Sequence, residues 1–120
     1  MTNTKNYSSR NLAEQTVELL IEKHAENIAL FDVGKTSQLT DFHIVVTGKN
    51  PPHLKALANE LRVVLKQAGS AYYKRAGEPD SGWIVIDYID VVVHLMSEEA
   101  REKYALDELW KHSKVDTAKD

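Results

Sequence analysis

The sequence contains no cysteine among its 120 residues, which excludes disulfides, thiolate metal sites and a cysteine nucleophile. The absence also fits a reducing compartment, and we expect a cytoplasmic protein. No apolar run approaches the ~20 residues that cross a bilayer, so we expect no contact with a membrane. With 15 basic against 18 acidic residues, the chain lacks the basic excess typical of nucleic-acid-binding proteins. We therefore expect little direct contact with RNA, and a basic protein is the more plausible partner.

What remains is the composition of an ordinary folded protein, with 42% hydrophobic and 28% charged residues. A chain of this length has room for one domain, because domains typically run to about 100–150 residues. Apolar residues with regular spacing lie between positions 9 and 112. We therefore predict a single domain over residues 9–112, with flexible tails at 1–8 and 113–120. The first ten residues also lack the apolar stretch of a signal peptide.

Apolar spacing predicts the helices and strands. Helical spacing occurs over residues 9–24, 51–68 and 98–110, the last as one helix or two short ones. Short β-branched runs predict strands over residues 27–33, 42–47, 71–75, 83–88 and 90–96, with a loop over 77–82. The order predicts an α/β domain: a mixed sheet of about five strands with helices packed on it.

Three helix starts carry capping signals. Asn11 followed by Glu14 resembles a capping box for the first helix. Asn50 before Pro51 is typical of the start of the second helix. Ser97 before two glutamates is typical of the start of the third.

The last two predicted strands are joined by almost no loop, so they form a hairpin whose register can be written out. A tight turn at residues 88–89 pairs Asp87 with Asp90 and Trp83 with His94. One face of the hairpin is then purely aliphatic, as expected of core, with Ile84, Ile86, Val91 and Val93. The other face carries Trp83, Val85, Asp87, Asp90, Val92 and His94.

This second face has the mixed composition of a protein–protein contact, with an aromatic side chain among aliphatic and charged ones. Two directly opposed carboxylates repel one another by about 0.2–1 kcal/mol. A basic partner would relieve that repulsion between Asp87 and Asp90 and would cover Trp83. The alternative is that a helix covers this face and Trp83 belongs to the core. Both interpretations stay open at this point.

Enzymatic signals are weak. Nucleotidyltransferases combine a Gly-Ser pair with two carboxylates two residues apart on a strand, which hold Mg²⁺. Here Gly34 and Ser37 are separated, and His43 follows Asp41 where the second carboxylate would stand. The five histidines lack metal-ligand spacing, and Asp87 with Asp90 lacks a visible pocket for acid–base work. We expect no catalytic residue, no metal and no cofactor.

Five stretches carry a resemblance to a known family: residues 32–33, 41–48, 53–58, 82–94 and 100–110. Together they make the chain, from about residue 11 to 110, similar to the ribosomal silencing factors, RsfS or Iojap. The resemblance implies a nucleotidyltransferase-like fold without catalytic residues. It also implies a translation repressor that binds a basic protein on the intersubunit face of the large ribosomal subunit. Bound there, such a protein blocks joining with the small subunit when nutrients are short.

The resemblance also implies where the partner binds, because it places Trp83 in the partner-binding region. We predict that the contact is made by Trp83, Val85, Asp87, Tyr88, Asp90, Val92 and His94. A homodimer through the same sheet region is a further implication. Two other functions stay open: an assembly factor of the large subunit, and a divergent nucleotidyltransferase.

The chain departs from the family pattern at Ile89, where a glycine is usual at the hairpin tip. Isoleucine disfavours the positive φ of a tight primed turn, so we expect a wider loop here. The loop at residues 77–81 is where the family varies, so its contacts stay open.

Overall fold

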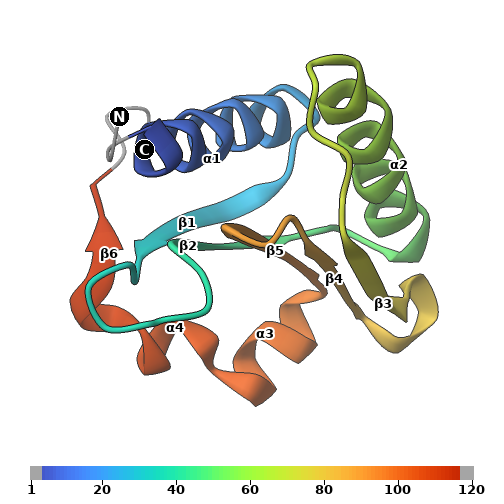
Figure 1. Ribbon diagram of the computed structural model, residues 1–120. Helices are drawn as coiled ribbons and strands as arrows, with labels where there is room; N and C mark the ends of the chain where they lie inside the picture. Colours follow the sequence, from blue (N-terminus) through green and yellow to red (C-terminus); the bar gives the residue numbers. More distant parts are fainter. Residues whose placement is uncertain (1–3, 117–120) are drawn as a thin grey trace.

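A mixed sheet with helices on both faces forms the domain (Figure 1). The computed structural model describes residues 4–116, with side chains from residue 9 onward. The strands are β1 (Glu26–Asp32), β2 (Phe42–Thr47), β3 (Lys74–Glu78), β4 (Trp83–Asp87), β5 (Val91–Met96) and β6 (Lys114–Val115). The helices are α1 (Thr4–Glu22), α2 (Pro51–Gln67), α3 (Glu98–Tyr104) and α4 (Leu106–Leu109), with 3₁₀ turns η1 (Pro79–Ser81) and η2 (Lys111–Ser113).

The strands lie in the order β3-β4-β5-β2-β1-β6. β2 runs parallel to β5, and the other neighbours are antiparallel. The predicted α/β architecture with a mixed sheet is therefore confirmed. The sixth strand was not predicted, because the two residues of β6 carry no apolar pattern of their own. They are held by pairing with Leu30 and Phe31 of β1.

The two faces of the sheet have separate cores. α1 and α2 cover one face (Figure 1), where Ile84, Ile86, Val91 and Val93 are buried as predicted for the aliphatic side of the hairpin. α3 and α4 lie against the other face, over a smaller core. That core contains Ala29, Phe31, Val33, Val45, Met96 and Ala100. Short helices cover less area than long ones, so the second face is only partly covered.

Two of the three predicted helix caps are confirmed. The Asn50 side chain accepts a hydrogen bond of 2.8 Å from the backbone N–H of His53, and the hydroxyl of Ser97 accepts one of 3.0 Å from Ala100. The predicted capping box at Asn11 and Glu14 is wrong, because both residues lie inside α1.

Secondary structure extends into both predicted tails. α1 begins at Thr4, and β6 forms at Lys114–Val115. Polar turns at the start of a helix carry no apolar spacing, so the pattern could not reveal them. The remaining residues of those predicted tails, 1–3 and 117–120, lie outside the described residues.

β3 lies three residues later than the predicted strand, at Lys74–Glu78, and it includes part of the predicted loop. Gly77 has φ +90 inside this strand. A Cβ at Gly77 would lie 2.0 Å from the carbonyl oxygen of Trp83, so only glycine permits this approach. A glycine that looks like a loop signal is here required by strand packing.

The register of the β4–β5 hairpin also differs from the prediction. Trp83 pairs with Met96 instead of His94, and Asp87 pairs with Val92 instead of Asp90. The displacement is by two residues, so each side chain keeps its predicted face. Asp87 and Asp90 are therefore not opposed, and the predicted repulsion across the strands is absent. The loop is wider than a tight turn, as expected from Ile89, yet Ile89 still has φ +75.

Candidate functional site

Aromatic and imidazole rings gather on the sheet face beneath α3 and α4. The indole Nε1 of Trp83 donates a hydrogen bond of 3.3 Å to Nδ1 of His94. Nε2 of His94 lies 3.1 Å from Nδ1 of His43. The His43 ring stacks on Trp110, with centroids 3.8 Å apart and planes 13° apart, and Tyr104 lies 4.6 Å from Trp83. We call these five residues the ring cluster.

The hydrogen bonds define the protonation of the histidines. An indole N–H only donates, so Nδ1 of His94 must be the acceptor and its proton must sit on Nε2. That proton is donated to Nδ1 of His43, so neither ring can carry a second proton without losing a bond. Burial lowers the pKa of His43 from 6.5 to about 4, opposed in part by nearby Asp87. Burial, with His43 beside it, lowers the pKa of His94 to about 3. Both rings are neutral at physiological pH.

Arg101 fastens α3 and α4 to the sheet. Its Nε and Nη2 donate to the two carboxylate oxygens of Asp107 at 2.9 and 2.8 Å. Its Nη1 donates to Thr47 Oγ1 at 3.1 Å and to the carbonyl oxygen of Asn27. The Arg101 bond lowers the pKa of Asp107. Three elements thus converge on one guanidinium, which keeps Trp110 over His43.

Beside the helices, part of the same sheet face is open. The register places Val85, Asp87 and Val92 on this face, next to Trp83 and His43. All five side chains are partly exposed. We call these five residues the open sheet face. It combines an aliphatic centre, a half-buried indole and one carboxylate, a composition suited to a protein partner.

The predicted contact residues divide into three groups. Trp83, Val85, Asp87 and Val92 come together on the open sheet face. His94 is only 6% exposed and lies behind Trp83, so it positions the indole instead of meeting a partner.

The remaining two lie elsewhere. Tyr88 is 7% exposed and belongs to the core beneath α2, where its hydroxyl donates to the Leu61 carbonyl oxygen at 3.5 Å. The predicted contact through the Tyr88 side chain is therefore unsupported, and we leave it out of the surface. Asp90 lies in the hairpin loop, where its carbonyl oxygen accepts hydrogen bonds from Asp41 and Phe42.

Asp41 and His43 do not form a shared site. The Asp41 carboxylate accepts a hydrogen bond of 2.9 Å from Ser9 of α1, whereas His43 stacks on Trp110. α1 and Trp110 lie on opposite sides of the sheet. The carboxylates of Asp32 and Asp41 both lie close to Gly34, and Asp32 is paired with Arg10 at 3.5 Å. Both carboxylates therefore already have partners of their own.

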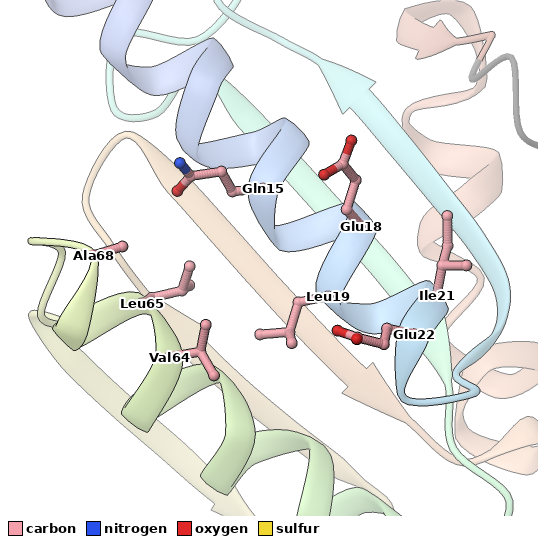
Figure 2. A pocket seen from close by; sticks show the side chains of 8 residues that line it. All are labelled: Gln15, Glu18, Leu19, Ile21, Glu22, Val64, Leu65 and Ala68. Atoms are coloured by element: carbon pink, nitrogen blue, oxygen red, sulfur yellow. The ribbon is translucent and has the colours of Figure 1, made fainter.

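A groove of about 650 Å³ runs along α1 beside α2. Figure 2 shows Leu19 of α1 pointing toward Val64 and Leu65 of α2. Glu18 and Glu22 line the rim, and the other described residues around the groove are aliphatic or amide side chains. Apart from these two carboxylates, the lining carries no side chain that commonly acts as a nucleophile.

Within residues 4–116, no three histidine, aspartate or glutamate side chains are placed to hold a metal ion. Among the helices of that same part, none has the length and apolar character required to cross a membrane.

Comparison with known proteins decides the family. The profile described as "Ribosomal silencing factor during starvation" matches residues 6–120. The chain belongs to this family. The ribosomal silencing factor RsfS of Haemophilus influenzae is 35% identical over 99 residues, which cover 82% of this chain and 97% of that protein. A mouse protein named "Mitochondrial assembly of ribosomal large subunit protein 1" is 31% identical and covers 81% of this chain, which matches 44% of its length.

Solved structures of silencing-factor relatives have the same fold. A crystal structure from Chromobacterium violaceum superposes with a TM-score of 0.81 at 32% identity, covering 91% of each chain. A second, from Bacillus halodurans, has a TM-score of 0.78 at 28% identity and covers 90% of this chain and 99% of that one. The implied likeness to nucleotidyltransferases stays a prediction.

Proposed function

We propose that this chain represses translation by binding a basic protein on the intersubunit face of the large ribosomal subunit. Bound there, it prevents the small subunit from joining, in the cytoplasm and notably under nutrient limitation. The family and the open sheet face support this proposal. Trp83, Val85 and Val92 supply an apolar centre, and Asp87 supplies an acidic edge for a basic partner.

The two kinds of side chain have different tasks in such a contact. Aromatic and aliphatic groups at the centre of an interface provide most of the affinity, because they leave water on binding. Carboxylates at the edge mainly raise the association rate toward a positively charged partner. The formal net charge of −3 acts in the same direction.

A role in assembly of the large subunit is the second candidate, favoured by the name of the mouse relative. The two functions differ in which particles carry the protein. A silencer is expected on mature large subunits in starved cells, and an assembly factor on immature ones during growth. A homodimer formed through the open sheet face would compete with binding to the large subunit in either function.

We propose that the chain acts by binding and not by nucleotidyl transfer. Asp41 and His43 are directed to opposite sides of the sheet, so they cannot share a metal pair. Isothermal titration with ATP and Mg²⁺ is expected to give no signal. Clear micromolar binding would contradict this part of the proposal.

Subunit joining followed by light scattering tests the silencing function. Purified large and small subunits are mixed with and without the wild-type chain, which is expected to suppress joining. Val85→Asp places a charge in the apolar centre and should abolish suppression. Val63→Asp makes the same change at an exposed valine of α2, away from the open sheet face, and should suppress joining like the wild type.

Thermal melts of both variants show whether they remain folded. Failure of the wild type to suppress joining would contradict the silencing proposal itself. Equal suppression by a folded Val85→Asp variant would instead show that another surface makes the contact.

A further inference from the structure

The tip of the β4–β5 hairpin has an unusual backbone conformation. The N–H of Asp90 donates to the carbonyl oxygen of Tyr88 at 2.9 Å, which closes a γ-turn around Ile89. Ile89 has φ +75, a region that glycine adopts readily and β-branched residues rarely do. The conformation at Ile89 is therefore strained.

Surrounding hydrogen bonds hold the strained turn in place. The Asp87 carboxylate accepts a hydrogen bond of 2.7 Å from the backbone N–H of Ile89. The backbone N–H of Tyr88 donates one of 2.8 Å to the Val91 carbonyl oxygen. The Asp90 carbonyl oxygen accepts from the backbone N–H groups of Asp41, just before β2, and of Phe42, its first residue, at 2.9 and 3.1 Å. The turn is thus fixed to its own hairpin and to the neighbouring strand.

The fold covers only part of the side chain at this position. Ile89 is 52% exposed, so about half of its surface faces water. The loop before β2, which bonds to the same turn, exposes 87% of Leu39. Strain at an exposed aliphatic residue points to a contact made outside the chain.

We propose that Ile89 is an apolar anchor for the protein partner, inserting into an aliphatic-lined depression on its surface. The proposal rests on the proposed function and extends the contact from the open sheet face to the hairpin tip. The turn fixes the direction of the side chain, so little conformational freedom is lost on binding. Asp87 at the base of the turn would repel phosphate, which favours a protein over RNA as the occupant.

Binding of the fluorescently labelled full chain to purified large ribosomal subunits tests the proposal. Ile89→Asn fits the positive φ but removes the aliphatic side chain, and we expect the dissociation constant to rise about tenfold or more. The same variant should keep the denaturation midpoint of the wild type, because asparagine tolerates positive φ at least as well as a β-branched residue. Loss of binding with an unchanged midpoint excludes unfolding as the cause.

Two further variants complete the experiment. Ile89→Leu keeps an aliphatic side chain and should bind within about threefold of the wild type. Ile21→Asn makes the matched change at an exposed isoleucine of α1, on the opposite side of the sheet, and should leave binding unchanged.

The outcomes separate this proposal from the proposed function. If the wild type does not bind large subunits, the proposed function fails. If the wild type binds and Ile89→Asn binds equally well, Ile89 is no anchor and only the present inference is overturned. If Ile21→Asn weakens binding as much as Ile89→Asn, the effect is not specific to the tip, which also overturns it.

Discussion

Trp83 reaches His94 diagonally across the hairpin, with 3.3 Å between the indole Nε1 and Nδ1 of the imidazole. The register pairs Trp83 with Met96 and His94 with Val85, so the bond joins residues that are not direct cross-strand neighbours. Trp83 is therefore both half-buried and part of the open sheet face. A half-buried indole is compatible with both interpretations that the sequence left open, and the contact role of Trp83 stays a prediction.

Substitutions of Trp83 should separate these two contributions. Trp83→Phe keeps an aromatic ring but leaves Nδ1 of buried His94 without a donor, and we expect it to lower the free energy of unfolding by about 1–3 kcal/mol. Trp83→Ala also removes the indole from the proposed contact and should weaken binding to large subunits by about 2 kcal/mol or more. Chemical denaturation and subunit binding measure the two effects. If Trp83→Ala loses its cooperative unfolding transition, Trp83 is core and its assignment as a contact residue fails.

The stability of the domain should depend on pH through its two neutral histidines. Their pKa values are lowered in the folded chain, to about 4 for His43 and about 3 for His94, from the usual 6.5. As pH falls below 6.5, the unfolded chain takes up protons first. The contribution of the two neutral histidines to the free energy of unfolding is therefore fully present above pH 6.5 and is lost toward pH 4. The loss approaches about 1.4 kcal/mol per pH unit for each proton.

Urea denaturation between pH 7.5 and 4.5 measures this dependence. His43→Gln removes one of the two protonation sites and should flatten the curve. His112→Gln removes an exposed histidine and should follow the wild type. A wild-type curve that stays level down to pH 4.5 would contradict the neutral pair.

Arg101 should be essential for the attachment of α3 and α4. Arg101→Lys cannot reproduce the two parallel bonds to Asp107, and we expect a loss of about 1–3 kcal/mol in the free energy of unfolding. Lys111→Ala removes an exposed ion pair with Glu108 at 3.4 Å and should change the free energy of unfolding by less than about 0.5 kcal/mol. Indole fluorescence should shift to the red in Arg101→Lys, because Trp110 becomes more accessible to water. Equal stability of the two variants would show that Arg101 does not fasten the helices.

The two aspartates of the hairpin should govern the rate of capture. In Asp87→Asn with Asp90→Asn, the amide oxygen at position 87 can still accept from Ile89, so the fold should be retained. Association with large subunits should be slower, and its dependence on salt should be flatter. Glu14→Gln with Glu22→Gln makes the same change in charge at exposed positions of α1. This control should leave the association rate and its dependence on salt unchanged.

Stopped-flow binding at two salt concentrations is the measurement. Suppression of subunit joining should follow the same order, stronger for the wild type at low salt. A double aspartate variant that captures subunits at the wild-type rate at both salts would exclude charge attraction at the tip.

Local patterns were sufficient for most elements of the fold. Helical spacing and the caps at Asn50 and Ser97 located α2 and α3, and the alternation in the hairpin assigned its buried face. These features depend on neighbours within a few residues, which the sequence displays directly. The predicted face of each hairpin side chain is correct although the predicted pairing is wrong, because a displacement by two residues leaves every side chain on the same face of the sheet.

The ring cluster could not be predicted in the same way. The sequence pointed to Trp83 and His94, but His43, Tyr104 and Trp110 come from three other elements. A stack such as that of His43 on Trp110 depends on strand order and helix packing, which leave no local pattern. The alternation of β2 places His43 on the same face as Val45, and this was the one available signal.

The sequence by itself determined the α/β class, the aliphatic face of the hairpin and, through long matching segments, the ribosomal silencing factor family. Only the tertiary structure decided that Tyr88 is core, that Asp87 and Asp90 are not opposed, and that Ile89 is strained and exposed. The burial of Tyr88 depends on the packing of α2, and the turn at Ile89 is bonded both to its own hairpin and to residues 41 and 42. A one-dimensional pattern records which side chains prefer burial, whereas contact between strands and helices determines which of them remain at the surface.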